Sequence, residues 1–104
     1  MSTITVYTKP ACVQCNATHN TLAAIGKRLG LGDADGEGWW NTIDLAENPD
    51  AVLELKAQKL MSAPAVFVYE DGEDGPTITE KWGGFRPDKL SELENQLSGA
   101  LVAA

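Results

Sequence analysis

The stretch TITVYTKPACVQC, residues 3–15, contains the pattern that decides the fold. Its first six residues alternate, with Ile4 and Val6 on one side and threonine and tyrosine on the other, which is typical of a β-strand. The next three residues interrupt the strand, and from Cys12 mostly apolar residues recur at helical spacing until Gly30. The sequence therefore predicts a strand followed by a helix, with Cys12 at the helix N-terminus.

Turn-forming residues divide the rest of the chain into three further strands and two further helices. The predicted strands are residues 39–45, 65–69 and 77–82. Each predicted helix begins with proline and aspartate, at Pro49 and at Pro87. The first should end near Lys59, and the second near Gly99. The final helix carries a leucine stripe at Leu90, Leu93, Leu97 and Leu101.

The resulting order, β-α-β-α-β-β-α, predicts an α/β fold with a four-stranded mixed sheet flanked by three helices. The first two strands need a crossover helix and must be parallel, whereas the last two are close enough in sequence to form an antiparallel hairpin. An exposed loop is expected at residues 30–38, because glycines and acids replace the periodic apolar residues there. With neither a repeat nor a boundary, residues 1–104 are expected to form a single domain.

Composition excludes several classes of function. Fifteen acidic and eight basic residues give a formal charge of −7, which opposes nucleic-acid binding and repels anionic lipid surfaces. The longest apolar run, residues 63–69, is too short to cross a bilayer. The first residues lack the features of a secretory signal peptide. We therefore expect a cytoplasmic protein without nucleic-acid or membrane partners, and we expect a monomer.

Cys12 and Cys15 are the only cysteines, and their spacing indicates redox chemistry. One helical turn separates them, so their Cα atoms can fall within the roughly 4.4–6.8 Å window that a disulfide requires. Because a helix N-terminus favours a thiolate, Cys12 is expected to be the exposed nucleophile. Cys15, one turn further in, should stay a thiol until it resolves a mixed disulfide on Cys12. Lys9 is a candidate to add positive charge beside the thiolate.

Zinc binding and a purely structural disulfide account less well for the cysteine pair. A structural zinc site needs four ligands, whereas the chain offers two cysteines and His19 as sulfur or imidazole donors. His19 is expected on an exposed helix face. A stabilising disulfide would be expected to close a longer loop. We therefore expect neither a metal nor a bound organic cofactor.

Three separated motifs resemble the NrdH-redoxins, which are glutaredoxin-like proteins of the thioredoxin superfamily. They are VYTKP leading into CVQC at residues 6–15, Ala63-Pro64 before the third strand, and WGGFRPDKL at residues 82–90. The resemblance implies the thioredoxin/glutaredoxin fold. It also implies a cis peptide bond at Pro64, facing the nucleophile, so that the backbone of Ala63 can pair with an extended substrate segment.

The same resemblance implies the partners and the residues that meet them. Thioredoxin reductase would reduce the oxidised form, with NADPH as the ultimate donor, and the dithiol would reduce the large subunit of class Ib ribonucleotide reductase. The expected partner-binding segment comprises Trp82, Gly83, Gly84, Phe85 and Arg86, besides Lys9, Ala63 and Pro64. Trp82 is expected to form a partly exposed apolar patch beside the disulfide. Phe85 and Arg86 are expected mainly to fix the loop.

Two alternative functions remain open. Paired glycines also occur in glutaredoxins, which bind glutathione through a neighbouring acidic pair. Here Phe85 and Arg86 occupy the place of those acids, and Val13-Gln14 replaces the Pro-Tyr of a dithiol glutaredoxin, so direct glutathione use is disfavoured. The second alternative is a non-catalytic binding subunit of the same fold, in which the cysteines are incidental.

Several features depart from a minimal family member. The chain is lengthened by the loop at residues 30–38, by an acidic turn expected to connect the last two strands at residues 70–76, and by the tail after Gly99. Gly83 stands where the family more often has serine. The adjacent Trp39 and Trp40 should face opposite sides of a strand. We expect one in the core and the other covering the inserted loop.

Overall fold

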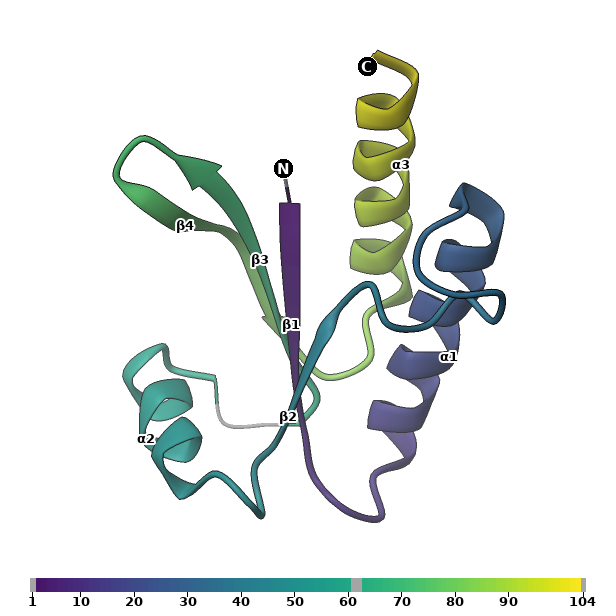
Figure 1. Ribbon diagram of the computed structural model, residues 1–104. Coiled ribbons are helices and arrows are strands. Elements are labelled where there is room, and N and C mark those ends of the chain that lie inside the picture. The colour runs from purple at the N-terminus through teal and green to yellow at the C-terminus, as the bar shows by residue number, and fades with distance from the viewer. Residues whose placement is uncertain (1, 61–62, 104) are drawn as a thin grey trace.

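The computed structural model describes residues 2–60 and 63–103 and confirms the predicted α/β fold (Figure 1). The side chains of residues 2 and 100–103 are outside this description. Along the chain, the elements are β1 (Ser2–Thr8), α1 (Val13–Leu29), β2 (Asn41–Asp44), α2 (Pro49–Ala57), β3 (Ala65–Gly72), β4 (Gly75–Gly83) and α3 (Pro87–Ala103). The predicted element order is therefore confirmed.

The strands form one mixed sheet in the order β2-β1-β3-β4. β1 pairs parallel with β2, as the crossover through α1 requires, and antiparallel with β3. The register of β1 and β3 joins Ser2 to Glu70 and Tyr7 to Ala65. β1 and β3 are thus the central strands, and the carboxyl end of β1 leads directly to the cysteines.

Helices cover both faces of the sheet, with α1 and α3 on one face and α2 on the other (Figure 1). On the first face, Ile4 and Val6 of β1 are buried against leucine and isoleucine side chains of the two helices. On the second, Tyr7 packs in a smaller cluster with Phe67 and α2 residues. Burial, with nearby Tyr69 and Glu54, raises the pKa of Tyr7 to about 12. The alternation predicted for β1 is therefore confirmed.

Helix α1 ends where predicted, and the loop after it turns back onto the helix. Gly30 adopts a left-handed conformation with φ of 71°, and its N–H donates to the carbonyl of Gly26. A Cβ on Gly26 would overlap the carbonyl oxygen of Gly36 and lie 2.6 Å from Nε1 of Trp39. That indole N–H donates to the carbonyl of Leu22 at 3.2 Å. Gly36 is buried, so the loop is not exposed throughout as predicted.

The second strand is shorter than predicted. β2 begins only at Asn41, so Trp39 and Trp40 precede it. Both indoles are half-buried, pack against the cluster between the sheet and helices α1 and α3, and contact each other edge to face at 5.4 Å. Neither is fully buried, so the expectation that one lies in the core is wrong. The expectation that one covers the loop holds for Trp39, whose Cδ1 would lie 3.2 Å from a Cβ built on Gly32. Because the pair is outside the strand, its side chains need not face opposite sides.

Both later helices differ from prediction at their C-terminal ends. α2 ends at Ala57, and Lys59 beyond it has a positive φ of 61°. α3 continues through Gly99, because a helical glycine costs only about 1 kcal/mol and neighbouring turns can offset this. The inward position predicted for Leu101 lies outside the described side chains.

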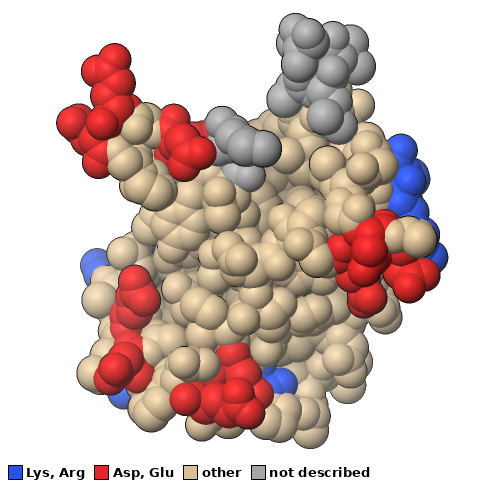
Figure 2. Space-filling view, viewed as in Figure 1, with Lys and Arg blue, Asp and Glu red and all other residues tan. Residues whose placement is uncertain are grey.

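The β3–β4 hairpin is longer than predicted. Its strands pair up to Gly72 and Gly75, so that Glu73 and Asp74 form the turn in place of the expected connection at residues 70–76. Antiparallel backbone pairing does not require apolar side chains, so the paired strands extend beyond the apolar residues from which their ends were predicted. Acidic side chains project from this tip (Figure 2).

None of the helices in the described part of the chain combines the length and apolarity that a membrane span requires.

Candidate redox site

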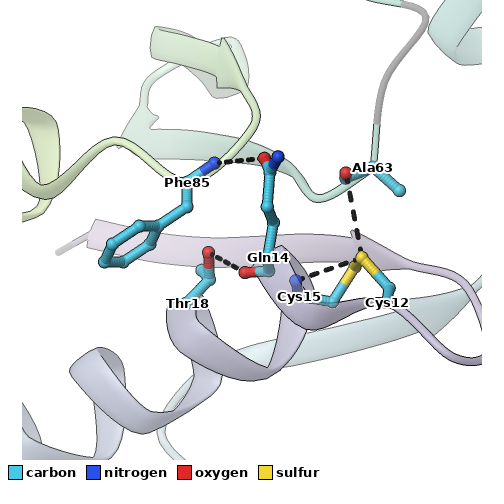
Figure 3. Close-up of a disulfide and its surroundings, with 6 residues drawn as sticks. All are labelled: Cys12, Gln14, Cys15, Thr18, Ala63 and Phe85. Carbon is cyan, nitrogen blue, oxygen red and sulfur yellow. Dashed lines mark hydrogen bonds between the residues drawn. A yellow bond between two sulfur atoms is a disulfide. The ribbon is translucent and has the colours of Figure 1, made fainter.

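Cys12 and Cys15 form a disulfide at the N-terminus of α1, with their Cα atoms 5.2 Å apart (Figure 3). Cys12 is the N-cap residue, with an extended backbone, and Cys15 lies within the first turn. The chain turns sharply just before them, at Ala11, which has a positive φ of 53°. The structure therefore places both predicted cysteines where the sequence indicated.

The helix terminus is suited to stabilising negative charge on the Cys12 sulfur. The backbone N–H of Cys15 donates to Sγ of Cys12 at 3.1 Å. The first turn of α1 contains no acidic residue that would oppose a thiolate. Partial positive charge at the N-terminus of this helix adds to that hydrogen bond. After reduction, the same geometry favours ionisation of Cys12 over Cys15.

Cys12 is less accessible than predicted. Cys12 is 8% exposed and Cys15 is 3% exposed, so the order is as expected, but the prediction of an exposed Cys12 is wrong. Its Sγ lies 3.9 Å from the carbonyl oxygen of Ala63, which partly covers it. In the disulfide the sulfur has no hydrogen to donate, so this approach is a contact. The neighbouring Val13 is 82% exposed and supplies apolar surface beside the disulfide.

The Ala63–Pro64 peptide bond is cis, as the resemblance implied. Pro64 is buried, whereas Ala63 is half-buried and faces Cys12 through its carbonyl. The carbonyl of Pro64 accepts the N–H of Gly84 at 2.7 Å. These contacts bring the second and third sequence motifs together beside the disulfide.

The backbone of the third motif joins both other motifs. Gly83 pairs with Ala65 in the sheet, and Gly84 has a positive φ of 81°, which glycine adopts without steric cost. The N–H of Phe85 donates to Oε1 of Gln14 at 3.1 Å (Figure 3). The segment at residues 83–85 is thus tied to the cis-proline loop and to the first turn of α1.

Trp82 does not form the partly exposed patch that was predicted. Its side chain is 5% exposed and belongs to the core cluster with Val68, Leu90 and Leu93. The error arises because Trp82 lies opposite Val66 in the sheet, on the face that α3 covers. The indole is therefore part of the core between the sheet and the helices on that face.

Phe85 and Arg86 make contacts of the kind expected of residues that fix the geometry of the loop after β4. The Phe85 ring is half-buried against the core cluster. Arg86 is exposed and binds Asp88 through two hydrogen bonds of 3.1 and 2.8 Å, and this guanidinium lowers the pKa of the Asp88 carboxyl. The predicted effect of both residues on loop geometry remains a prediction that these contacts favour.

Lys9 and His19 differ in their relation to the cysteines. Lys9 is exposed on the turn before Cys12. His19 is half-buried rather than exposed, because its ring packs on Trp40 at 5.9 Å, and this burial lowers the pKa of the imidazole. Within residues 2–60 and 63–103, one cluster of three potential metal ligands is found, the exposed acids Asp33, Asp35 and Glu37. It contains neither cysteine.

Comparison with known proteins now identifies the family. The glutaredoxin family model matches residues 4–73. The chain is 31% identical over 90 residues to the glutaredoxin-like protein NrdH of Salmonella typhimurium and 29% identical to that of Escherichia coli K12. Each alignment covers 86% of this chain and 86% of the relative. This chain belongs to the glutaredoxin family.

Solved structures similar to this glutaredoxin-family protein support the fold. A thioredoxin from Trichomonas vaginalis aligns with a TM-score of 0.68 at 14% identity, covering 92% of this chain and 78% of that one. A thioredoxin from Fasciola hepatica aligns with a TM-score of 0.64 at 16% identity, covering 91% and 79%. At these identities the likeness shows the thioredoxin fold alone, which confirms the predicted fold class.

Family and cysteine geometry together define the chemistry. A glutaredoxin-family chain with a disulfide-forming Cys-x-x-Cys pair at a helix N-terminus is a thiol–disulfide oxidoreductase. The predicted enzyme class and the resemblance to NrdH proteins are therefore confirmed. Gln14 is the residue that sequence reasoning missed, because nothing in its neighbourhood signals a contact with a segment 71 positions away.

Proposed function

We propose that this protein is an NrdH-type electron carrier that delivers two electrons to class Ib ribonucleotide reductase and recovers them from thioredoxin reductase. The observation that carries the proposal is the position of the Cys12 sulfur, at the N-terminus of α1 and against the Ala63 carbonyl, in a chain similar to NrdH proteins. The resemblance of the three motifs to NrdH-redoxins supplies the two partners.

In the first step, the Cys12 thiolate attacks a sulfur of the partner disulfide. A mixed disulfide forms between Cys12 and the partner, the partner disulfide breaks, and one partner sulfur leaves as a thiolate that takes up a proton. The extended partner segment lies along the backbone of Ala63 beside the cis Pro64. The N–H of Cys15 stabilises Cys12 before the attack.

In the second step, Cys15 releases the reduced partner. Cys15 loses its proton and attacks Sγ of Cys12, which breaks the mixed disulfide and forms the Cys12–Cys15 disulfide seen in the structure. The second partner sulfur leaves as a thiol. The partner gains two electrons and two protons. The protein supplies both electrons, and the two protons balance the one that Cys15 loses and the one that Cys12 released when it ionised.

The partner surface is formed by groups around the disulfide rather than by the Trp82 ring. Val13 offers exposed apolar area and Lys9 exposed positive charge, while Arg86 offers an exposed guanidinium that is paired with Asp88. Gly83 and Gly84 keep the backbone on this side free of bulky side chains.

NADPH consumption tests the choice of electron donor. The protein is oxidised and supplied as the electron acceptor to thioredoxin reductase, and in parallel to glutathione with glutathione reductase. Turnover with thioredoxin reductase alone supports the proposal, and turnover with glutathione alone replaces it with the glutaredoxin alternative. The reduced protein is then supplied to class Ib ribonucleotide reductase, where failure to sustain deoxyribonucleotide formation would remove that partner.

A further inference from the structure

Gln14 connects the first turn of α1 to the third motif through its side chain. Its Oε1 accepts the N–H of Phe85 at 3.1 Å, and its own backbone carbonyl accepts the hydroxyl of Thr18 at 2.9 Å. Figure 3 shows the Gln14 side chain rising from the helix toward Phe85 and away from the two sulfurs. An exposed residue between the cysteines therefore holds a distant loop without contacting the reacting atoms.

The loop is shaped to receive this side chain. A Cβ placed on Gly84 would lie 3.2 Å from Oε1 of Gln14, so a side chain at this position would crowd the amide. Gly84 also has a positive φ of 81°, which disfavours other residues. The consecutive N–H groups of Gly84 and Phe85 donate to Pro64 and to Gln14, respectively. Residues 84 and 85 are thus hydrogen-bonded both to the cis-proline loop and to the first turn of α1.

We propose that Gln14 is a positioning residue that holds the backbone at residues 83–85 in the place where a protein substrate docks. The inference rests on the proposed docking of an extended partner segment along Ala63. With the Gln14 amide in place, the backbone at residues 83–85, here called the loop wall, is held in position before a partner binds. Without it, the partner must order this wall on binding, which weakens docking.

This role predicts an effect that depends on the kind of disulfide. A protein disulfide brings neighbouring backbone that contacts the loop wall, whereas a small organic disulfide reaches Cys12 without touching that wall. Loss of the Gln14 hydrogen bond should therefore raise KM for a protein substrate and leave kcat unchanged. The small disulfide should be reduced with unchanged kinetics.

Two matched variants test the role. Gln14→Leu keeps the size and helix propensity of the side chain but removes the acceptor, and Gln14→Glu keeps an acceptor oxygen. Kinetics are measured with insulin and with 2-hydroxyethyl disulfide, each with dithiothreitol as reductant. Hydrogen exchange of the Phe85 amide, measured by NMR, reports the hydrogen bond itself. The pH dependence of Cys12 alkylation by iodoacetamide reports the added charge of Gln14→Glu.

We expect Gln14→Leu to raise KM for insulin about five-fold, which is the scale of one hydrogen bond, and to speed exchange of the Phe85 amide. Gln14→Glu should restore KM to within about two-fold while moving the alkylation profile to higher pH. An unchanged KM for insulin, an equal rise for both disulfides, or no rescue by Gln14→Glu would each overturn the proposal. Since neither reductase is used, failure of the proposed partners would leave this result standing.

Discussion

Two loops reach helix α1 at opposite ends, and they hold it in different ways. At the C-terminal end, the loop after Gly30 comes so close that Gly26 has no room for a Cβ beside Gly36. At the N-terminal end, the segment at residues 83–85 reaches the helix through the Gln14 side chain. The first contact is backbone against backbone, and the second is a single exposed hydrogen bond.

This difference separates stability from reactivity along one helix. Close packing at the C-terminal end tolerates no added atom, so substitutions there should act on the free energy of unfolding. The N-terminal end carries the disulfide, with the exposed side chain of Val13 beside it, so substitutions there should act on catalysis. Substitutions along the helix test this separation.

The largest effect is expected at the cysteines. Cys12→Ser should lower insulin reduction by at least about a hundred-fold and form no mixed disulfide, whereas Cys15→Ser should accumulate one, because the resolving thiol is missing. Non-reducing electrophoresis and intact mass measure the trapped species. A trapped species found only with Cys12→Ser would falsify the assignment of the two roles and place the nucleophile at Cys15.

The next effect is expected at the opposite end of α1. Gly26→Ala should lower the free energy of unfolding by about 1–3 kcal/mol, because the new methyl group would overlap the Gly36 carbonyl and force the loop outward. Denaturant unfolding measures this, with insulin reduction per folded molecule expected to stay unchanged.

Gly99→Ala is the matched control for that glycine. Nothing lies within 4 Å of a Cβ built on Gly99, which is also helical, so alanine should stabilise the protein by up to about 1 kcal/mol through helix propensity. If Gly26→Ala stabilised the protein as Gly99→Ala does, the loop after Gly30 would not be in close contact with α1.

A smaller effect, dependent on pH, is expected at His19 in the middle of the helix. Burial against Trp40 lowers the pKa of the imidazole below its ordinary value of 6.5, although nearby Glu37 opposes this. As the pH falls, His19 therefore becomes protonated in the unfolded chain before it does in the folded protein. The contribution of this burial to the free energy of unfolding is present above the ordinary pKa and is lost between about pH 7 and 5. Because His19 is the only histidine, His19→Gln should flatten this part of the profile. Denaturant unfolding at pH 7.5 and 5.5 distinguishes the two proteins, and equal slopes would contradict the burial argument.

The smallest effect is expected for Arg28 near the C-terminal end of α1. It binds Glu94 of α3 through two hydrogen bonds of 2.7 Å and lowers the pKa of that carboxyl, but the pair is solvated. Arg28→Gln should therefore shift the unfolding midpoint slightly at low salt and still less at 1 M salt. A large shift that persists at high salt would mean that this ion pair, rather than close packing, fixes the C-terminal end.

Local sequence patterns correctly predicted the order of the helices and strands and the position of Cys12 at the N-terminus of a helix. The alternation of Ile4 and Val6, the glycine at Gly30 and the proline at Pro49 act through neighbouring residues, so one sequence is sufficient to interpret them. The cis bond at Pro64 came from the family resemblance, since propensity alone favours trans.

Contacts between distant segments account for the errors. The burial of Trp82 depends on α3, and the pairing of Gln14 with Phe85 joins two motifs whose spacing along the chain gives no sign of contact. The close approach of Gly36 to Gly26 likewise depends on how the loop returns. In each case the deciding neighbour is fixed by tertiary packing rather than by local preference.

The central position of β1 has a consequence for how the protein folds during synthesis. β1 precedes the other strands along the chain, yet its antiparallel partner β3 follows only after both intervening helices, with Ser2 paired to Glu70. The β3–β4 hairpin, by contrast, closes between Gly72 and Gly75 and needs no distant segment. Local contacts would therefore form this hairpin without waiting for β1, whereas the pairing of β1 with β3 joins distant segments and comes late. Until then helix α1 would lack the sheet it packs on, and because isolated helices of this size are marginal in water, the helix N-terminus on which the proposed role of Cys12 depends would be incompletely formed.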